Sequence, residues 1–278
     1  MTIRSLSVLV AAGACLLGFG QAASAAIITV PQTSLIASTT YYTDTIGGGI
    51  GNISVTTGGG NAANVGNATG RNDDGFRGPI SLGFSITFFG QTYNSLYINN
   101  NGNVSFGNGI SAYVPTGPTG ANAPVISPFF GDVDTRGAAS GVVHYRQDIA
   151  NEFIVTWDNV GYYSSHTDQL NSFQLVLRGS DYDLPVGEGT IGFFYKGMGW
   201  ERTDTSTVAA IGFGDGLGNA VVLQGSTEAG LKSVVQNHHI WFDPLLRPVD
   251  PHDVPEPASL ALVGLGLAAI GAAKRRRA

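Results

Sequence analysis

The side chains of this 278-residue sequence that could do chemistry are mainly aspartates. Asp132 and Asp134 are two positions apart, so both carboxylates point to one face if the segment is extended. Asp73, Asp74 and Asp158 could come close to them in the folded chain. Clustered carboxylates suit Ca²⁺, which takes about six to eight oxygen ligands. One interpretation is therefore a calcium site at Asp132 and Asp134, and the sequence predicts no other cofactor.

Two other roles are open to the same carboxylates. Asp132 or Asp134 could pair with Arg136 or Arg146 and fix a loop, or cap a turn. Paired acids could also hydrolyse a glycosidic bond, which requires a suitable spacing across a cleft. Asp132, Asp134 and Asp158 would then be the catalytic candidates of a secreted carbohydrate-active enzyme.

Sequence motifs of the common enzyme classes are absent. The chain has no G-x-S-x-G, H-E-x-x-H or C-x-x-C pattern. His238 and His239 are the one close pair of histidines, and adjacent residues of a strand point to opposite faces, so they do not easily chelate one metal. We therefore expect a non-catalytic protein.

Aromatic residues could instead form a platform on which sugar rings stack. The candidates for such a platform are Tyr41, Tyr42, Trp157, Tyr162, Tyr163 and Trp200. Alternation puts Trp157 on the face of Phe153 and Val155, which favours the core. Tyr163 and Trp200, which we expect on loops, are the better candidates for sugar binding.

The N-terminal segment 1–25 has the three parts of a signal peptide in order. Arg4 supplies a positive charge, an apolar run spans 6–19, and Ala23-Ser24-Ala25 is a pattern that signal peptidase cuts. We expect a signal helix that is removed after Ala25. An uncleaved membrane helix and a lipoprotein modified at Cys15 are the alternatives. Cys15 is the only cysteine, so the mature protein would have no disulfide.

The C-terminal segment 254–278 combines a motif, an apolar stretch and a basic cluster. The motif is Val254-Pro255-Glu256-Pro257, 258–273 carries no charge, and Lys274-Arg275-Arg276-Arg277 follows. This predicts a short transmembrane helix in the inner membrane, with the basic cluster on the cytoplasmic side and the domain outside. The proline-rich linker 244–253 precedes it.

This arrangement resembles the PEP-CTERM sorting signal, in which a Pro-Glu-Pro motif, a short transmembrane stretch and a basic tail occur in this order. The resemblance covers 254–277. It implies processing by an exosortase, in addition to signal peptidase at the other end, and a Gram-negative host that makes exopolysaccharide. A plain membrane anchor that is never cut is the alternative.

The region between the two ends is acidic. Five of the 14 basic residues and one of the 20 acidic residues lie in the terminal segments, which leaves 9 basic and 19 acidic residues in 26–253. Because nucleic acid and anionic membrane surfaces carry charge of the same sign, we expect no nucleic-acid partner. Divalent cations and neutral polysaccharides remain open as partners.

The same region has the residue pattern of an all-β domain. Short alternating or apolar runs occur at 86–88, 97–98, 142–145, 153–157, 173–177, 191–195, 221–223 and 240–242. Asn101-Gly102 predicts a tight hairpin turn, and 47–70, rich in Gly, Asn and Thr, predicts a long irregular loop or a decorated sheet edge. These signals predict an antiparallel β-sandwich with very little helix.

Several separated blocks of the sequence resemble the nidogen-like (NIDO) domain. The blocks are 72–75, 79–84, 86–90, 93–106, 125–136, 141–146, 153–163 and 171–177. They occur in the family's order, which makes the resemblance specific. It implies an extracellular domain of the kind found in matrix and adhesion proteins, and the family has no established catalytic residues.

These features predict five segments: a signal peptide 1–25, the N-terminal part of the β domain 26–71, a NIDO-like β domain 72–243, a linker 244–253 and a sorting signal 254–278. The expected protein is exported to the cell surface or beyond, after transient anchoring in the inner membrane. Its expected role is cell–matrix adhesion or association with biofilm or exopolysaccharide. The alternatives are a secreted carbohydrate-active enzyme and a sugar- or calcium-binding module without an adhesive role.

Overall fold

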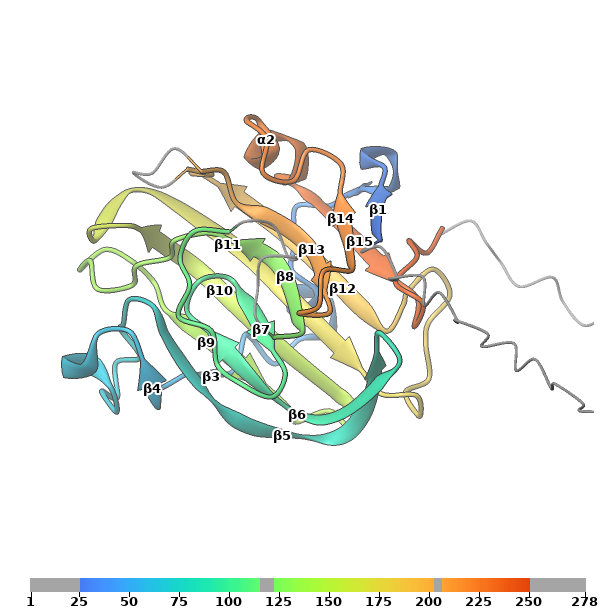
Figure 1. The fold of residues 1–278 in the computed structure, drawn as a ribbon, viewed down its shortest axis with the longest axis horizontal. Helices are drawn as coiled ribbons and strands as arrows, with labels where there is room; N and C mark the ends of the chain where they lie inside the picture. The colour runs from blue at the N-terminus through green and yellow to red at the C-terminus, as the bar shows by residue number, and fades with distance from the viewer. Residues whose placement is uncertain (1–25, 116–122, 203–206, 251–278) are drawn as a thin grey trace, which may run out of the picture.

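The computed structural model of the protein describes residues 26–115, 123–202 and 207–250. Two β-sheets lie face to face around a shared layer of apolar side chains (Figure 1). The expected signal helix 1–25 and the expected sorting signal 254–278 lie outside the described residues. In the part that is described, no helix is both long enough and apolar enough to cross a membrane.

The first sheet has eight strands. In spatial order they are β1 (Ile27–Val30), β14 (Ala220–Leu223), β13 (Ala210–Gly214), β8 (Val125–Phe130), β7 (Asn103–Ser105), β6 (Gln91–Asn99), β5 (Gly75–Phe88) and β4 (Gly58–Gly59). β1 runs parallel to β14, whereas the other neighbours pair antiparallel. The predicted antiparallel sandwich is therefore observed except at this edge, where the sheet is mixed because the chain enters it from its N-terminal end rather than from a hairpin.

The second sheet has seven strands and is antiparallel throughout. In spatial order they are β2 (Ile36–Ala37), β15 (His238–Phe242), β12 (Ile191–Met198), β11 (His166–Arg178), β10 (Glu152–Tyr162), β9 (Val143–Arg146) and β3 (Asn52–Ile53). The helical elements among the described residues are the short α1 (Tyr42–Ile46), α2 (Leu231–Val235), η1 (Gln32–Ser34) and η2 (Ala62–Asn64). The expectation of a domain with very little helix is confirmed.

The core between the sheets is built from alternate residues of the long strands. Phe153, Val155 and Trp157 of β10 point into it and are fully buried. Trp157 stacks on Phe173 of β11 at 5.1 Å between ring centroids, and its indole N–H donates to the Asn100 carbonyl at 3.0 Å. The predicted core position of Trp157 is confirmed, and an aromatic pair of this kind stabilises by about 1 kcal/mol beyond its buried area.

The outer face of the second sheet is also covered. Ile154, Val176 and Trp241 point away from the main core and pack with Tyr41 and Tyr42 in a second apolar cluster. Because both faces of the sheet are buried, the middle of β10 and β11 is apolar at nearly every position rather than at alternate ones.

Two local predictions of the sequence are visible in the fold. β6 and β7 form a hairpin, and Gly102 in its turn has φ of 74°. A Cβ at Gly102 would lie 1.9 Å from the Phe129 carbonyl oxygen, so the close approach requires glycine. The stretch 47–70 contributes the edge strand β3 to one sheet and the edge strand β4 to the other, which confirms a decorated edge.

Candidate functional site

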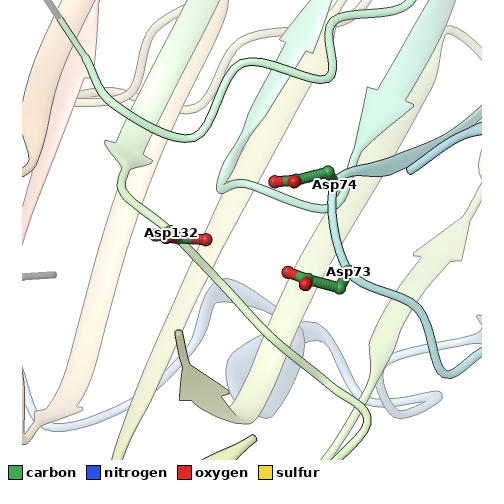
Figure 2. A group of neighbouring side chains, drawn as sticks. All are labelled: Asp73, Asp74 and Asp132. Carbon is green, nitrogen blue, oxygen red and sulfur yellow. The ribbon is translucent and has the colours of Figure 1, made fainter. Parts of the chain in front are cut away.

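Three carboxylates converge beside the first sheet. Asp73 and Asp74 immediately precede β5, and Asp132 follows β8 after one glycine. A bridge between Asp73 and Asp134 brings the two segments together. One carboxylate oxygen from each of Asp73, Asp74 and Asp132 lies within 4.8 Å of the others. Figure 2 shows the three side chains pointing into a common space.

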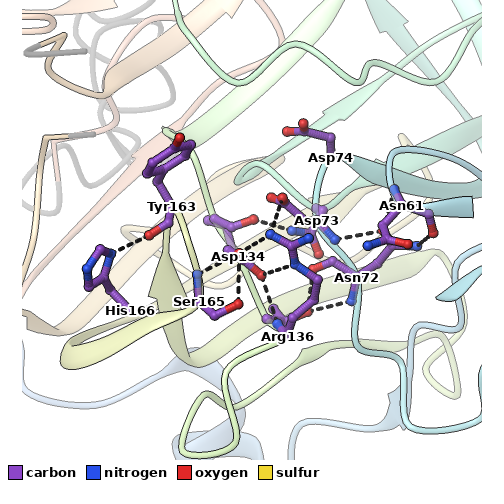
Figure 3. A network of polar contacts seen from close by, with 12 residues as sticks. Asn61, Asn72, Asp73, Asp74, Asp134, Arg136, Tyr163, Ser165 and His166 are labelled. Atoms are coloured by element: carbon purple, nitrogen blue, oxygen red, sulfur yellow. Dashed lines mark hydrogen bonds and ion pairs between the residues drawn. The ribbon is translucent and has the colours of Figure 1, made fainter. Parts of the chain in front are cut away.

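Asp134 has a different set of partners, the contacts of a structural carboxylate. Arg136 holds it through two side-chain bonds, Nε to Oδ1 at 2.9 Å and Nη2 to Oδ2 at 2.6 Å. The backbone N–H groups of Arg136 and Ser165 also donate to it (Figure 3). Burial raises its pKa, but these hydrogen bonds outweigh burial and lower the pKa of Asp134 below its usual value. The pairing with Arg136, one of the alternatives for this residue, is therefore present in the structure.

The carboxylates of Asp73 and Asp74 receive fewer hydrogen bonds and ion pairs than that of Asp134. Burial, together with the nearby carboxylates of Asp134 and Asp74, raises the pKa of Asp73 to about 7, against the opposing effect of Arg136. Arg136 Nη2 lies 2.7 Å from Asp73 Oδ2, whereas Asp73 Oδ1 is buried and has no hydrogen-bond partner among the described residues. Burial also raises the pKa of Asp74, although Asn101 and Arg136 oppose this. The charged forms of both carboxylates are therefore disfavoured in these surroundings.

Asn101 completes this group, although its place in the sequence does not mark it as a site residue. It lies in the β6–β7 turn, is 1% exposed, and donates from Nδ2 to Asp74 Oδ1 at 2.7 Å and to the Ala112 carbonyl at 3.0 Å. Its own Oδ1 is buried without a partner in the described part of the chain. The Asn-Gly pair signals a turn in the sequence, but nothing in it signals contact with residues 73–74.

The other candidate residues lie in separate surroundings. Asp158 accepts a hydrogen bond from the Tyr41 hydroxyl at 3.0 Å, on the outer face of the second sheet. Arg146 pairs with Asp148 rather than with Asp132 or Asp134. The three acids proposed for a carbohydrate-active enzyme, Asp132, Asp134 and Asp158, therefore do not converge on one another as the group with Asp73 and Asp74 does.

The suggested sugar-binding platform fails for most of its aromatic residues, because these are buried. Trp200 is 3% exposed, packs edge-on against Phe129, and donates its indole N–H to the Val160 carbonyl at 3.1 Å. Tyr41 and Tyr42 are buried as well. Position next to a loop did not keep these rings exposed, because the domain has enough apolar surface nearby to cover them. Tyr163, at 41% exposure, remains a candidate for sugar contact.

The two adjacent histidines have different environments, as expected for neighbouring strand positions. His239 stacks on Phe194 at 5.2 Å, and burial, together with the charge of His238, lowers its pKa. His238 contacts the Gln236 carbonyl through Nδ1 at 2.8 Å. These contacts are those of packing residues in β15.

Comparison with protein families gives two matches that together extend over most of the chain. Residues 28–248 match the family described as NIDO related, and residues 253–277 match the PEP-CTERM protein-sorting motif. The first match begins in β1 and extends past β15. No solved structure matches the chain.

Individual relatives are much longer proteins. Alpha-tectorin of Gallus gallus is 26% identical in an alignment of 231 residues that covers 69% of this chain and 10% of the relative. For nidogen of Drosophila melanogaster the identity is 29% in an alignment of 199 residues that covers 56% of this chain and 14% of the relative. For human alpha-tectorin it is 33% in an alignment of 131 residues that covers 38% of this chain and 6% of the relative. Each alignment thus covers a small part of the relative, and since the family match takes in well over half of the chain, this protein belongs to the NIDO-related family and carries a C-terminal PEP-CTERM sorting motif.

Proposed function

We propose that this protein is an exported surface or extracellular-matrix protein that contributes, without catalysis, to cell–matrix adhesion or to association with biofilm exopolysaccharide. The observation that carries the proposal is the presence of a NIDO-related domain and a PEP-CTERM motif in one chain. The sorting motif implies export and exosortase processing, and the NIDO resemblance implies a domain of matrix and adhesion proteins.

The arrangement of the domain supports presentation outside the cell. β1 begins two residues after the expected cleavage site at Ala25, so the mature chain would enter the sandwich at once. At the other end, β15 finishes at Phe242 and the chain turns back on it: Phe242 bridges to Pro248, and the Val249 N–H donates to the Trp241 carbonyl at 2.8 Å. Leu246 is buried in the main core, so residues 244–249 of the predicted linker belong to the folded domain rather than to an extended stalk.

The distribution of acids supports a non-catalytic role. A glycosidase needs two carboxylates on opposite sides of the scissile bond, with environments that separate their pKa values. Here Asp134 is tied to Arg136 and Asp158 to Tyr41, and each has the contacts of a structural residue. The adhesive role therefore fits the described residues better than the rival carbohydrate-active enzyme does.

Deletion of residues 26–250, with both terminal segments kept, tests this proposal. We expect reduced attachment of the cells to a surface and unchanged hydrolysis of their own exopolysaccharide. Full-length Asp158→Asn, which removes one acid of the rival enzyme, is the matched control and should attach as the wild type does. Unchanged attachment with lost hydrolysis would replace the adhesive role with the enzymatic one.

A further inference from the structure

We propose that Asp73, Asp74 and Asp132 bind one calcium ion, with the side-chain oxygen of Asn101 as a neutral ligand. This goes beyond the adhesive role and does not depend on it. The ligand set also differs from the pair Asp132 and Asp134 suggested by the sequence, because Asp134 is occupied by Arg136.

The spacing of the three carboxylates matches the size of the ion. Calcium binds oxygen at about 2.3–2.6 Å, so two ligands on opposite sides of it are separated by roughly 5 Å. The oxygens of Asp73, Asp74 and Asp132 lie within 4.8 Å of one another. A single ion between them can therefore contact all three without moving either chain segment far.

The charge around Arg136 favours a cation. Asp73, Asp74 and Asp134 are three carboxylates that one guanidinium, that of Arg136, faces. Arg136 binds both oxygens of Asp134 but only Oδ2 of Asp73. A divalent ion at the opposite oxygen of Asp73 would offset the remaining negative charge.

The orphaned oxygens are an observation independent of the acidic cluster. Asn101 is only 1% exposed, and its Nδ2 donates to Asp74 Oδ1 at 2.7 Å. Its Oδ1 is buried and has no hydrogen-bond donor among the described residues. Asp73 Oδ1 is in the same state. Buried oxygens without a donor are rare in folded proteins, and a bound ion accounts for both of them.

Calcium suits this donor set better than magnesium. Carboxylates and a neutral amide oxygen from three separate segments of the chain would form an irregular shell, which calcium accepts. Magnesium requires a nearly regular octahedron at about 2.0–2.1 Å and keeps most of its waters. The ion would join the start of β5, the β6–β7 turn and the segment after β8, which are distant in sequence.

Isothermal titration calorimetry of the full chain, purified in detergent and stripped with EGTA, tests this site. We expect one calcium ion per chain, with magnesium at least tenfold weaker. Asp74→Asn and Asp132→Asn should each weaken calcium binding at least tenfold. Asp148→Asn, at an exposed acid paired with Arg146, is the matched control and should leave the affinity unchanged.

Folded wild-type protein that takes up no calcium would overturn the proposal, and so would unchanged affinity in Asp74→Asn. Since Asp132 is buried, its variant counts only if its near-ultraviolet circular dichroism equals that of the wild type; otherwise Asp74→Asn and Asn101→Ala decide. Attachment of cells is not measured in this experiment, so its failure would leave the adhesive role standing.

Discussion

Two arginines hold different regions of this domain together, and their surroundings differ in burial and in charge balance. Arg178 is fully buried, contacts Glu152 Oε2 at 3.0 Å and Glu188 Oε2 at 2.5 Å, and donates to the Gly189 carbonyl. The rings of Tyr42, Tyr182 and Trp241 also lie 4.2–5.0 Å from its guanidinium carbon. Arg136 is 31% exposed and lies beside Asp73 and Asp134, with Asp74 and Asp132 close by.

The difference separates a structural cluster from a candidate binding site. At Arg178, the guanidinium N–H groups donate to Glu152, Gly189 and Glu188, and aromatic rings surround the cation. One oxygen of Glu152 has no partner among the described residues. At Arg136, one guanidinium faces the carboxylates of Asp73, Asp74 and Asp134, and Oδ1 of Asp73 and of Asn101 has no hydrogen-bond partner in the described part of the chain. Burial alone therefore does not identify a site, whereas burial with uncompensated charge does.

The largest expected effect is at Arg178. Arg178→Met leaves Glu152 buried without its cation, so we expect a loss of about 3–5 kcal/mol in the free energy of unfolding. Urea denaturation followed by tryptophan fluorescence measures this. The loss should be the same with calcium and with EGTA, and a loss that calcium reversed would mean that the two clusters are not separate.

Calcium should stabilise the other region. At free calcium about 100 times the dissociation constant, a ligand that binds the folded state alone adds about 2.7 kcal/mol to the free energy of unfolding. Asp74→Asn should lose most of this gain, whereas Arg178→Met should retain it. Parallel denaturation curves of the three proteins make the comparison, and an equal gain in Asp74→Asn would place the ion elsewhere.

Removal of the Arg136 cation should have opposite effects on folding and on binding. Arg136→Gln removes hydrogen bonds to charged Asp134, which costs about 1.5–3 kcal/mol in EGTA. It also removes a positive charge beside Asp73, so calcium should bind more tightly than in the wild type. Denaturation and calorimetry report the two quantities, and weaker calcium binding would show that Arg136 positions a ligand rather than competes with the ion.

A smaller effect concerns the outer face of the second sheet, where His239 lies. Its folded pKa is below the ordinary 6.5, mainly through burial, so the unfolded state binds more protons in acid. Its contribution to stability is complete above about pH 6.5 and declines as the pH falls toward the folded pKa. Asp73, with its raised pKa, acts in the opposite direction near pH 7. The test therefore compares the free energy of unfolding of the wild type with that of His239→Gln at pH 7 and at pH 5. We expect the difference between the two proteins to change between these pH values, and a constant difference would contradict the role of His239.

Local patterns in the sequence predicted much of the fold. Alternation in 153–157 placed Trp157 in the core, and Asn101-Gly102 predicted the β6–β7 turn. The parallel pairing of β1 with β14 was missed, because it joins residues 27–30 to 220–223 and no local signal encodes such a pairing. The exposure of Trp200 was misjudged for the same reason, since Phe129 covers it from a distant strand.

The candidate site was predicted in part. Its residue types were recognised, and Asp132 and Asp134 both lie near Asp73, but Arg136 holds Asp134 whereas Asp132 groups with Asp73 and Asp74. The contact of Asp74 with Asn101, 27 positions away, depends on how β5 meets the hairpin. Chemistry is readable from residue types, whereas the grouping of ligands is a property of the tertiary fold.

Diffraction from crystals of the protein grown with calcium tests the difference between the two arginine clusters most directly. The structure predicts one anomalous-scattering peak, within about 2.3–2.6 Å of oxygens from Asp73, Asp74 and Asp132. No peak is expected at the cluster of Arg178 with Glu152 and Glu188. Absence of an ion among the three aspartates at saturating calcium, or an ion bound beside Glu152 instead, would contradict the account.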